Sequence, residues 1–261
     1  MKIFHVDAFT RKAFAGNPAG VCVLTHPMVD SWMQDVAREM NLSETAFLIR
    51  MADGYSLRWF TPAVEVELCG HGTLASTHVL FQEGFARTGD RIMFHTASGL
   101  LTAWQEGDWI GLDFPSKPDK EIPIPDDLAA ALGVPVRYTG LSHFDYIVEV
   151  DSEQAVRDIC PDFGLLLRLP VRGIIVTSRS DSNEFDFVSR FFAPAVGVNE
   201  DPVTGSAHCC LGPFWGRRFG KDELVGYQAS GRGGVVRVRL RGERVNLFGQ
   251  AVTVMEGELT V

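Results

Sequence analysis

Several features that would place a protein in a particular class are missing or scarce in this sequence. No uninterrupted apolar stretch reaches the roughly 18 residues that a membrane helix needs, and His5 and Asp7 interrupt the apolar run at the N-terminus before it has the length of a secretory signal. Positive charge is also scarce, because 24 Lys and Arg stand against 33 Asp and Glu, for a net charge of −9. The sequence therefore predicts no membrane span and no nucleic-acid partner, whereas a small acidic ligand remains compatible with one local positive site.

Cysteine is too rare and too irregularly placed for a disulfide framework. The count is five, an odd number, and Cys209 and Cys210 are adjacent. We expect free thiols and a reducing, cytoplasmic location. The strings CGH and HCC lack the paired C-x2-C or H-x3-H spacing of zinc sites, so no metal is expected.

Signatures of nucleotide chemistry and of serine hydrolysis are absent as well. The segment GRRFGKD (216–222) has one residue too few between its glycines, and it carries Asp where a P-loop needs Ser or Thr. No G-x-S-x-G elbow occurs, and no G-x-G-x-x-G follows a strand and opens a helix. The sequence therefore predicts no cofactor.

What is present is a strand-rich pattern with scattered helices, in a chain of 261 residues that can form one large domain or two small ones. β-Branched and aromatic residues dominate the apolar runs, which predicts an α+β fold with mixed or antiparallel sheets. The predicted strands are 2–9, 19–25, 45–50, 55–60, 99–114, 145–150, 172–179, 185–192, 233–240, 244–249 and 251–261. The predicted helices are 30–40, 73–84 (with Gly84 as its C-cap), 125–133, 152–160 and 205–220.

The segment PSKPDKEIPIPDD (115–127), with four prolines and several charges, divides the chain into halves of similar size. We interpret 116–127 as a linker between an N-terminal half, 1–115, and a C-terminal half, 128–261. The last strand, about 251–261, is a candidate to complete the first sheet.

The two halves contain related motifs, FTPAVEVELCGHGTLASTH (60–78) and FAPAVGVNEDPVTGSAHC (192–209). The shared aromatic-x-Pro-Ala-Val-x-Val spacing indicates an internal duplication. In this alignment Cys69 falls opposite Asp201. After one inserted residue, Gly72 and Thr73 fall opposite Gly205 and Ser206.

Both motifs predict a loop followed by a small-residue turn that begins a helix. The unpaired N–H groups and the positive end of a helix dipole favour an anion there, so two such turns facing each other could clamp a small carboxylate. Taken singly, each turn is more often only a cap, and each acid or histidine in it is more often structural. The residues concerned are Gly70, His71, Gly72, Thr73, Asp201, Thr204, Gly205 and Ser206, together with Glu44 in the connector NLSETAFL (41–48).

At this level the chain resembles the PhzF family of phenazine-biosynthesis isomerases, which are related to diaminopimelate epimerase. The stretches that carry the resemblance are FTRKAFAGNPAGVCVL, MNLSETAFL, FTPAVEVELCGHGTLA, FFAPAVGVNEDPVTGSAHC and QASGRGGVVRV, and they span nearly the whole chain. The resemblance implies two pseudo-symmetric halves, each a curved mixed β-sheet or barrel wrapped around a central helix. It also implies an active cleft between the halves and a homodimer.

The same resemblance implies cofactor-independent proton transfer within a small carboxylic acid. Glu44 would be the general acid/base, and His71 and Asp201 would share in proton handling. The implied substrate-binding residues are Asn17, Gly70, Gly72, Thr73, Thr204, Gly205 and Ser206.

Two other functions stay open at this stage. One is a member of the fold that binds a metabolite or a partner without catalysis. The other is an epimerase that uses Cys69 with Asp201, because Cys69 stands where diaminopimelate epimerase has one of its two catalytic cysteines and Asp201 stands at the partner position. The sequence does not name the substrate.

Overall fold

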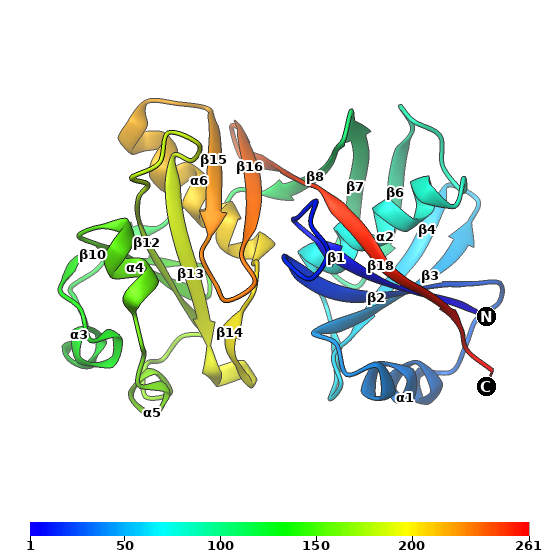
Figure 1. The fold of residues 1–261 in the computed structure, drawn as a ribbon, viewed down its shortest axis with the longest axis horizontal. Helices are drawn as coiled ribbons and strands as arrows, with labels where there is room; N and C mark the ends of the chain where they lie inside the picture. The colour runs from blue at the N-terminus through cyan, green and yellow to red at the C-terminus, as the bar shows by residue number, and fades with distance from the viewer. Residues whose placement is uncertain (261) are drawn as a thin grey trace. The chain divides into compact units, whose positions relative to one another are not determined.

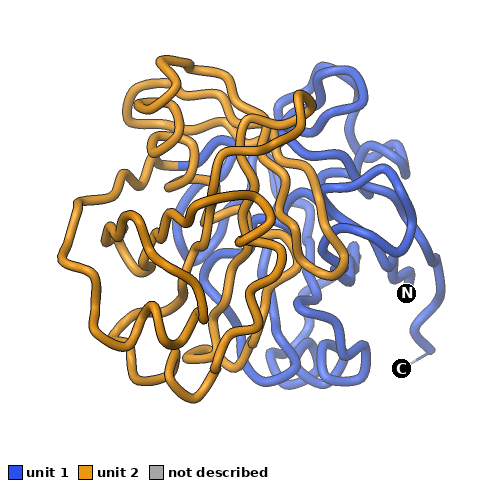
Figure 2. Tube along the Cα trace, turned by 60° about the vertical axis from the view of Figure 1, so that its left-hand side comes forward, with its two compact units in different colours: residues 1–114, 248–261 blue, residues 115–247 orange. Residues whose placement is uncertain are grey.

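The computed structural model describes residues 1–260, and its chain divides into two compact units. Unit 1 contains residues 1–114 and 248–261, and unit 2 contains residues 115–247 (Figure 2). The expected linker, 116–127, falls within unit 2 and holds a two-residue strand and the start of a helix. In the described part of the chain, no helix combines the length and apolar character needed to cross a membrane.

Unit 1 is a mixed sheet with one short surface helix and one buried helix. The C-terminal strand β18 pairs antiparallel with β1, so the two ends of the chain lie in the same unit. Its elements are β1 (Lys2–Ala8), β2 (Asn17–Leu24), α1 (Asp30–Met40), β3 (Glu44–Met51), β4 (Gly54–Phe60), β5 (Glu65–Val66), α2 (Gly70–Gln82), β6 (Arg91–Thr96), β7 (Gly99–Glu106), β8 (Trp109–Pro115) and β18 (Ala251–Glu258).

Unit 2 has the same kind of sheet around its own buried helix. Its elements are β9 (Lys120–Glu121), α3 (Asp126–Leu132), β10 (Val136–Ser142), β11 (Asp145–Val150), α4 (Glu153–Asp158), α5 (Phe163–Leu166), β12 (Gly173–Arg179), β13 (Phe187–Ala193), the 3-10 helix η1 (Pro194–Val196), β14 (Val198–Asp201), α6 (Gly205–Phe219), β15 (Glu223–Gln228) and β16 (Gly234–Arg241). Strand β17 (Arg244–Gly249) crosses the boundary between the two units in the sequence.

The strand pairings of the two units follow one pattern. In unit 1 the pairs β1–β2, β2–β3, β3–β4, β4–β6 and β6–β7 alternate antiparallel, parallel, antiparallel, parallel, antiparallel. In unit 2 the pairs β10–β11, β11–β12, β12–β13, β13–β15 and β15–β16 alternate in the same way. The helices α2 and α6 occupy the same place in this order, so the chain has two pseudo-symmetric halves with an α+β fold.

The buried helices explain why each sheet curves. Helix α2 packs against β1, β2, β3, β7 and β18, and nearly every residue from His71 to Leu80 is buried. Helix α6 packs against β11, β15 and β16 (Figure 1). There the absence of a side chain at Gly212 and Gly216 lets the helix approach Val238 and Leu240 of β16 closely. Helices that are apolar on all sides belong in a core, and each sheet wraps around one of them.

Most predicted elements are found, with some corrections. Helix 30–40 agrees with α1, and 205–220 agrees with α6 to one residue. The predicted helix 73–84 instead runs from Gly70 to Gln82, with Gly84 at φ 74° just beyond its C-cap, because the glycine-rich turn is itself helical. The predicted strand 99–114 is the hairpin β7–β8, since Gly107 adopts φ 59° and turns the chain. The strands β6, β10 and β15 were not predicted.

Candidate active site

In unit 1 the first candidate site forms at the N-terminus of α2, where a cysteine caps the helix. Cys69 Sγ accepts a hydrogen bond from the Gly72 N–H at 3.2 Å, and the Thr73 hydroxyl donates to the Cys69 carbonyl oxygen at 2.6 Å. The Thr73 hydroxyl therefore stabilises the turn itself. Gly72 is needed here because a Cβ atom would lie 2.8 Å from both Cys69 Sγ and Cδ1 of the buried Trp59.

The turn places His71 beside Glu44, which begins the neighbouring strand β3. His71 Nε2 lies 2.8 Å from Glu44 Oε2, and both side chains are largely shielded from solvent. On the other side of the ring, the Asn17 amide nitrogen lies 3.2 Å from His71 Nδ1. Ser43 donates a hydrogen bond to Asn17 Oδ1 at 3.3 Å, so β2 and the start of β3 together hold the imidazole in place.

The electrostatics of this group favour a proton on the imidazole. Burial by itself would lower the pKa of His71, but the neighbouring Cys69 and Glu44 outweigh burial and hold the pKa well above its ordinary value. Burial raises the pKa of the Cys69 thiol, and the charge of Glu44 adds to that effect. The arrangement therefore places a carboxyl group, an imidazole and a thiol in contact, and such a group can store and exchange a proton.

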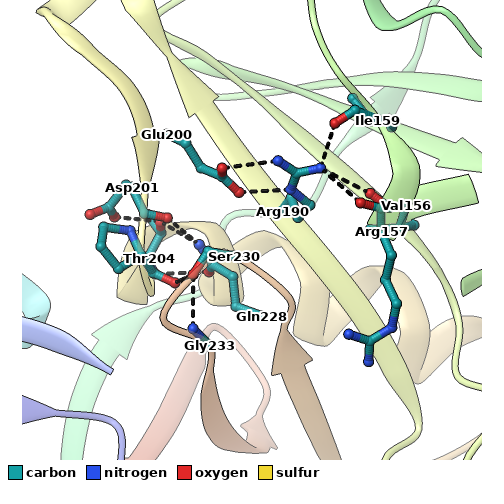
Figure 3. Close-up of polar contacts among 11 residues, drawn as sticks. Val156, Arg157, Ile159, Arg190, Glu200, Asp201, Thr204, Gln228, Ser230 and Gly233 are labelled. Atoms are coloured by element: carbon teal, nitrogen blue, oxygen red, sulfur yellow. Dashed lines mark hydrogen bonds and ion pairs between the residues drawn. The ribbon is translucent and has the colours of Figure 1, made fainter. Parts of the chain in front are cut away.

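In unit 2 the second candidate site forms at the N-terminus of α6. Thr204 is the N-cap residue, and its hydroxyl donates a hydrogen bond to Asp201 Oδ2 at 2.5 Å. The Thr204 backbone N–H donates to Gln228 Oε1 at 2.8 Å. Gln228 Nε2 in turn donates to the Asp201 carbonyl oxygen at 2.7 Å, so a strand far along the sequence holds this loop (Figure 3).

The acid that precedes Asp201 has a different partner. Arg190 binds both carboxylate oxygens of Glu200, through Nε at 2.7 Å and Nη2 at 2.9 Å. The same guanidinium donates to the carbonyl oxygen of Ile159 at 2.7 Å (Figure 3). Through Arg190, Glu200 thus ties β14 to β13 and to the end of α4.

Comparison with known proteins gives these two turns a family context. Residues 6–257 match the family model PhzC-PhzF, described as phenazine biosynthesis-like protein. The chain belongs to this family. An uncharacterized isomerase from Halalkalibacterium halodurans is 57% identical over 258 residues, covering 98% of this chain and 97% of that protein.

Solved structures agree with this membership of the PhzF family. A crystal structure of a PhzF-family phenazine biosynthesis protein from Enterococcus faecalis is 41% identical, has a TM-score of 0.96, and covers 100% of this chain and 99% of that chain. A probable proline racemase from Agrobacterium radiobacter, solved with bound carbonate, is 13% identical with a TM-score of 0.64 and covers 100% of this chain and 93% of that chain. The second likeness shows that the fold extends beyond the PhzF family.

The predicted site residues fall into two groups, one in each unit. Glu44 and His71 are in direct contact, and Asp201 and Thr204 are in direct contact. Glu44 and Asp201 belong to different units, so the expectation that they lie within a few ångströms of each other stays a prediction. The group in unit 1 is Asn17, Glu44, Gly70, His71, Gly72 and Thr73, and the group in unit 2 is Asp201, Thr204, Gly205 and Ser206.

Three polar residues that contact the unit 2 turn were not singled out from the sequence. Gln228 bonds to Asp201 and Thr204, and Arg190 binds Glu200. Arg172 donates to the Ser206 hydroxyl at 3.1 Å and forms a two-pronged ion pair with Asp145. Gln228 does stand in the QASGRGG stretch that carries part of the resemblance. No local pattern marks Arg172 or Arg190, because their side-chain hydrogen-bond partners are 27 or more and 10 or more residues away in sequence.

The unit 1 group also contains three kinds of metal ligand. One ligand atom each from Glu44, Cys69 and His71 lie within 4.8 Å of one another. Zinc binds cysteine as the thiolate, so an ion here would have to displace the proton of a buried thiol whose pKa burial raises. The Sγ atom is already engaged as the helix cap, so the group suits proton exchange better than metal binding.

Proposed function

We propose that this protein is a cofactor-independent isomerase that moves a proton between carbon atoms of a small carboxylic acid. The observation that carries the proposal is the buried contact of 2.8 Å between Glu44 and His71 at the N-terminus of α2. Membership of the PhzF family and the isomerase names of its relatives support it.

The proposed chemistry needs only one proton and no change of oxidation state. Glu44 as a carboxylate takes a proton from a carbon that is activated by a neighbouring carboxyl group or double bond. The C–H bonding electrons delocalise into the substrate, and the protonated Glu44 then delivers the proton to a different carbon atom. His71 keeps the carboxyl group oriented, and the N–H groups of Gly70 and His71 at the start of α2 stabilise the negative charge that develops on the substrate.

We propose that Asp201 takes part in the same reaction from unit 2. Its carboxylate is held by the Thr204 hydroxyl at 2.5 Å, and it lies at the start of a second helix with Gly205 and Ser206 in its first turn. A helix N-terminus with a hydroxyl beside it suits the carboxylate of the substrate, which fits a small anionic metabolite as ligand.

Deuterium incorporation in heavy water tests this proposal. The panel of candidate substrates contains an amino-hydroxy-cyclohexadiene carboxylate and common amino and hydroxy acids. Mass spectrometry and NMR detect the incorporated deuterium. We expect one substrate to gain deuterium at a new carbon position with the wild-type protein. We expect Glu44→Gln to lose at least about a hundredfold in rate, and the exposed Glu67→Gln to serve as an unaffected control.

The same experiment separates the alternatives. Deuterium at an inverted stereocentre, lost in Cys69→Ser, would favour a thiol-dependent epimerase, for which the 3.6 Å contact between Cys69 Sγ and His71 Nδ1 is the supporting observation. Ligand-induced thermal stabilisation without any deuterium incorporation across the panel would favour a binding protein. Unchanged incorporation in Glu44→Gln would contradict the proposed mechanism.

We also propose a homodimer, on the basis of the family resemblance. Light scattering at micromolar concentration should then give about twice the 28.8 kDa of one chain. A mass of one chain at that concentration would contradict the proposal.

A further inference from the structure

We propose that Gln228 is a positioning residue that orients the Asp201 carboxylate through the Thr204 hydroxyl, an inference that rests on the proposed role of Asp201. Gln228 is fully buried at the end of β15. Its side-chain amide contacts three atoms of the loop that precedes α6: the Asp201 carbonyl oxygen, the Thr204 N–H and the Thr204 hydroxyl (Figure 3). No other part of the proposed mechanism uses this residue.

The polarity of these contacts follows from one unambiguous donor. The Thr204 backbone N–H can only donate, so the atom of Gln228 that lies 2.8 Å from it must be Oε1. The amide orientation is thereby fixed, and Nε2 faces the Asp201 carbonyl oxygen at 2.7 Å and Thr204 Oγ1 at 3.2 Å. Nε2 has two N–H donors, one for each of these acceptors.

The orientation of the Thr204 hydroxyl is fixed by the same reasoning. A hydroxyl has one proton to donate, and on its Gln228 side Oγ1 receives a hydrogen bond. Its own proton therefore points to Asp201 Oδ2, at the short distance of 2.5 Å. Gln228 therefore donates to Thr204, and Thr204 donates to Asp201. The opposite direction would require the Thr204 backbone N–H to accept a hydrogen bond.

The consequence for Asp201 is a fixed orientation of its carboxylate. Oδ2 accepts the Thr204 hydroxyl proton. This hydrogen bond holds the carboxylate in one orientation when Asp201 takes up or releases a proton during the reaction. Gln228 sets this orientation through Thr204, without touching the carboxylate itself.

The surrounding structure keeps Gln228 rigid enough for this role. Its backbone is paired on both sides, with Ser189 of β13 and with Gly234 of β16. Two residues later, the Ser230 hydroxyl donates to the Pro202 carbonyl oxygen at 2.7 Å and accepts from the Gly233 N–H at 3.1 Å (Figure 3). The segment that follows β15 thus holds the Asp201–Thr204 loop at two points.

Four variants and two measurements test the inference. Gln228→Met keeps the length of the side chain and removes its hydrogen bonds, Thr204→Val removes the hydroxyl, and Thr204→Ser restores it. Thr177→Val is the matched control, because Thr177 is also a fully buried hydroxyl of unit 2, bonded to Val188 and Trp215 instead. The measurements are the steady-state rate of deuterium incorporation into the substrate found in the panel, and the hydroxyl proton signal of Thr204 in the substrate-free protein by NMR.

We expect Gln228→Met and Thr204→Val to lower kcat by about tenfold to a hundredfold with little change in KM, because the carboxylate is misaligned while the substrate still binds. Thr204→Ser should recover most of the rate, and Thr177→Val should lose stability without losing rate. In the wild-type protein the Thr204 hydroxyl should give a downfield, slowly exchanging signal that Gln228→Met loses and Thr177→Val keeps.

Asp201→Asn distinguishes failure of this inference from failure of the proposed function. If Asp201→Asn is inactive while Gln228→Met keeps the wild-type kcat and the Thr204 signal, Gln228 has no positioning role although Asp201 does act. If Asp201→Asn keeps the full rate, the proposed role of Asp201 is wrong and the inference falls with it. A Thr204 hydroxyl signal that is unchanged in Gln228→Met would overturn the polarity argument on its own.

Discussion

The N-terminal turns of α2 and α6 occupy equivalent places in the two units, yet they differ in nearly every functional group. The turn of α2 is capped by a thiol and presents His71 to Glu44. The turn of α6 has Thr204 as its N-cap residue and presents the Thr204 hydroxyl to Asp201. The two units therefore share one backbone plan, and the side chains at their equivalent turns differ.

The histidines of the two helices make the difference clearest. Neighbouring Cys69 and Glu44 hold the pKa of His71 above its ordinary value, whereas burial lowers the pKa of His208 to about 4. His208 Nδ1 lies 2.9 Å from the Thr204 carbonyl oxygen, within the helix. One turn therefore holds a charged group suited to proton exchange, and the other holds a neutral histidine that serves the fold.

The largest expected effect separates the two adjacent acids of the α6 turn. Asp201→Asn should lower deuterium incorporation by about a hundredfold or more, as expected for a group that handles the transferred proton. Glu200→Gln should stay within about threefold of the wild-type rate and lower the melting temperature, because it weakens the two-pronged pair with Arg190. Rates and melting curves of both variants check this.

The reverse outcome would be equally informative. A large rate loss in Glu200→Gln with a normal rate in Asp201→Asn would mean that the unit 2 acid has been misassigned.

The second prediction concerns pH and uses the opposite shifts of the two histidines. His208 has a folded pKa of about 4, below the ordinary value of 6.5. Between these values the unfolded chain binds a proton that the folded chain does not, so stability falls as the pH drops from 6.5 to 4, by up to about 3 kcal/mol from this residue. His71 has a raised pKa, so its contribution is fully present below pH 6.5 and is lost as the pH rises through the folded value.

Urea unfolding across this pH range, compared between the wild-type protein and His208→Asn, checks the His208 contribution. Asn keeps a donor for the Thr204 carbonyl oxygen and does not titrate, so the variant should lose less stability on acidification. Identical acid slopes for the two proteins would contradict the account of His208.

Sequence reasoning found the two turns because their signal is local. The Phe-x-Pro-Ala-Val spacing, the small residues and the acids all stand within one stretch of each half, FTPAVEVELCGHGT and FAPAVGVNEDPVTGS. It did not find Gln228 or Arg190, because each acts on a loop that is reached only after the strands have paired. It also missed β10 and β15, whose sequences VRYTGLS and ELVGYQ interrupt their apolar residues with charged residues and glycine.

Gly72 has a packing role that its place in the motif did not suggest. The sequence placed it among the expected substrate-binding residues, and in the structure a Cβ atom at this position would meet Cys69 and Trp59 at 2.8 Å. Gly72→Ala should therefore destabilise unit 1 by about 1–3 kcal/mol through overpacking. Gly231→Ala, where a Cβ would have no neighbour within 4 Å, should change stability by less than about 0.5 kcal/mol. Urea unfolding of both variants checks this, and equal effects would contradict it.

The smallest expected effect concerns the thiols. Cys160 is exposed, whereas Cys22, Cys69, Cys209 and Cys210 are buried. Burial also raises the pKa of Cys22, Cys209 and Cys210 to about 12, which suppresses the reactive thiolate. Iodoacetamide should therefore modify one thiol per chain, with no loss of deuterium incorporation. Rapid modification of Cys69 with loss of activity would support the thiol-dependent epimerase instead.

The central claim is that the two diverged turns, one from each unit, act in a single proton-transfer reaction. A double-mutant cycle on the rate of deuterium incorporation, with Glu44→Gln, Asp201→Asn and the combination of both, tests this most directly. If the two acids act as one unit, the double variant should be about as slow as the slower single variant, because removing the second group costs little once the first is lost. Rate losses that multiply in the double variant, or a single variant with the wild-type rate, would contradict the claim.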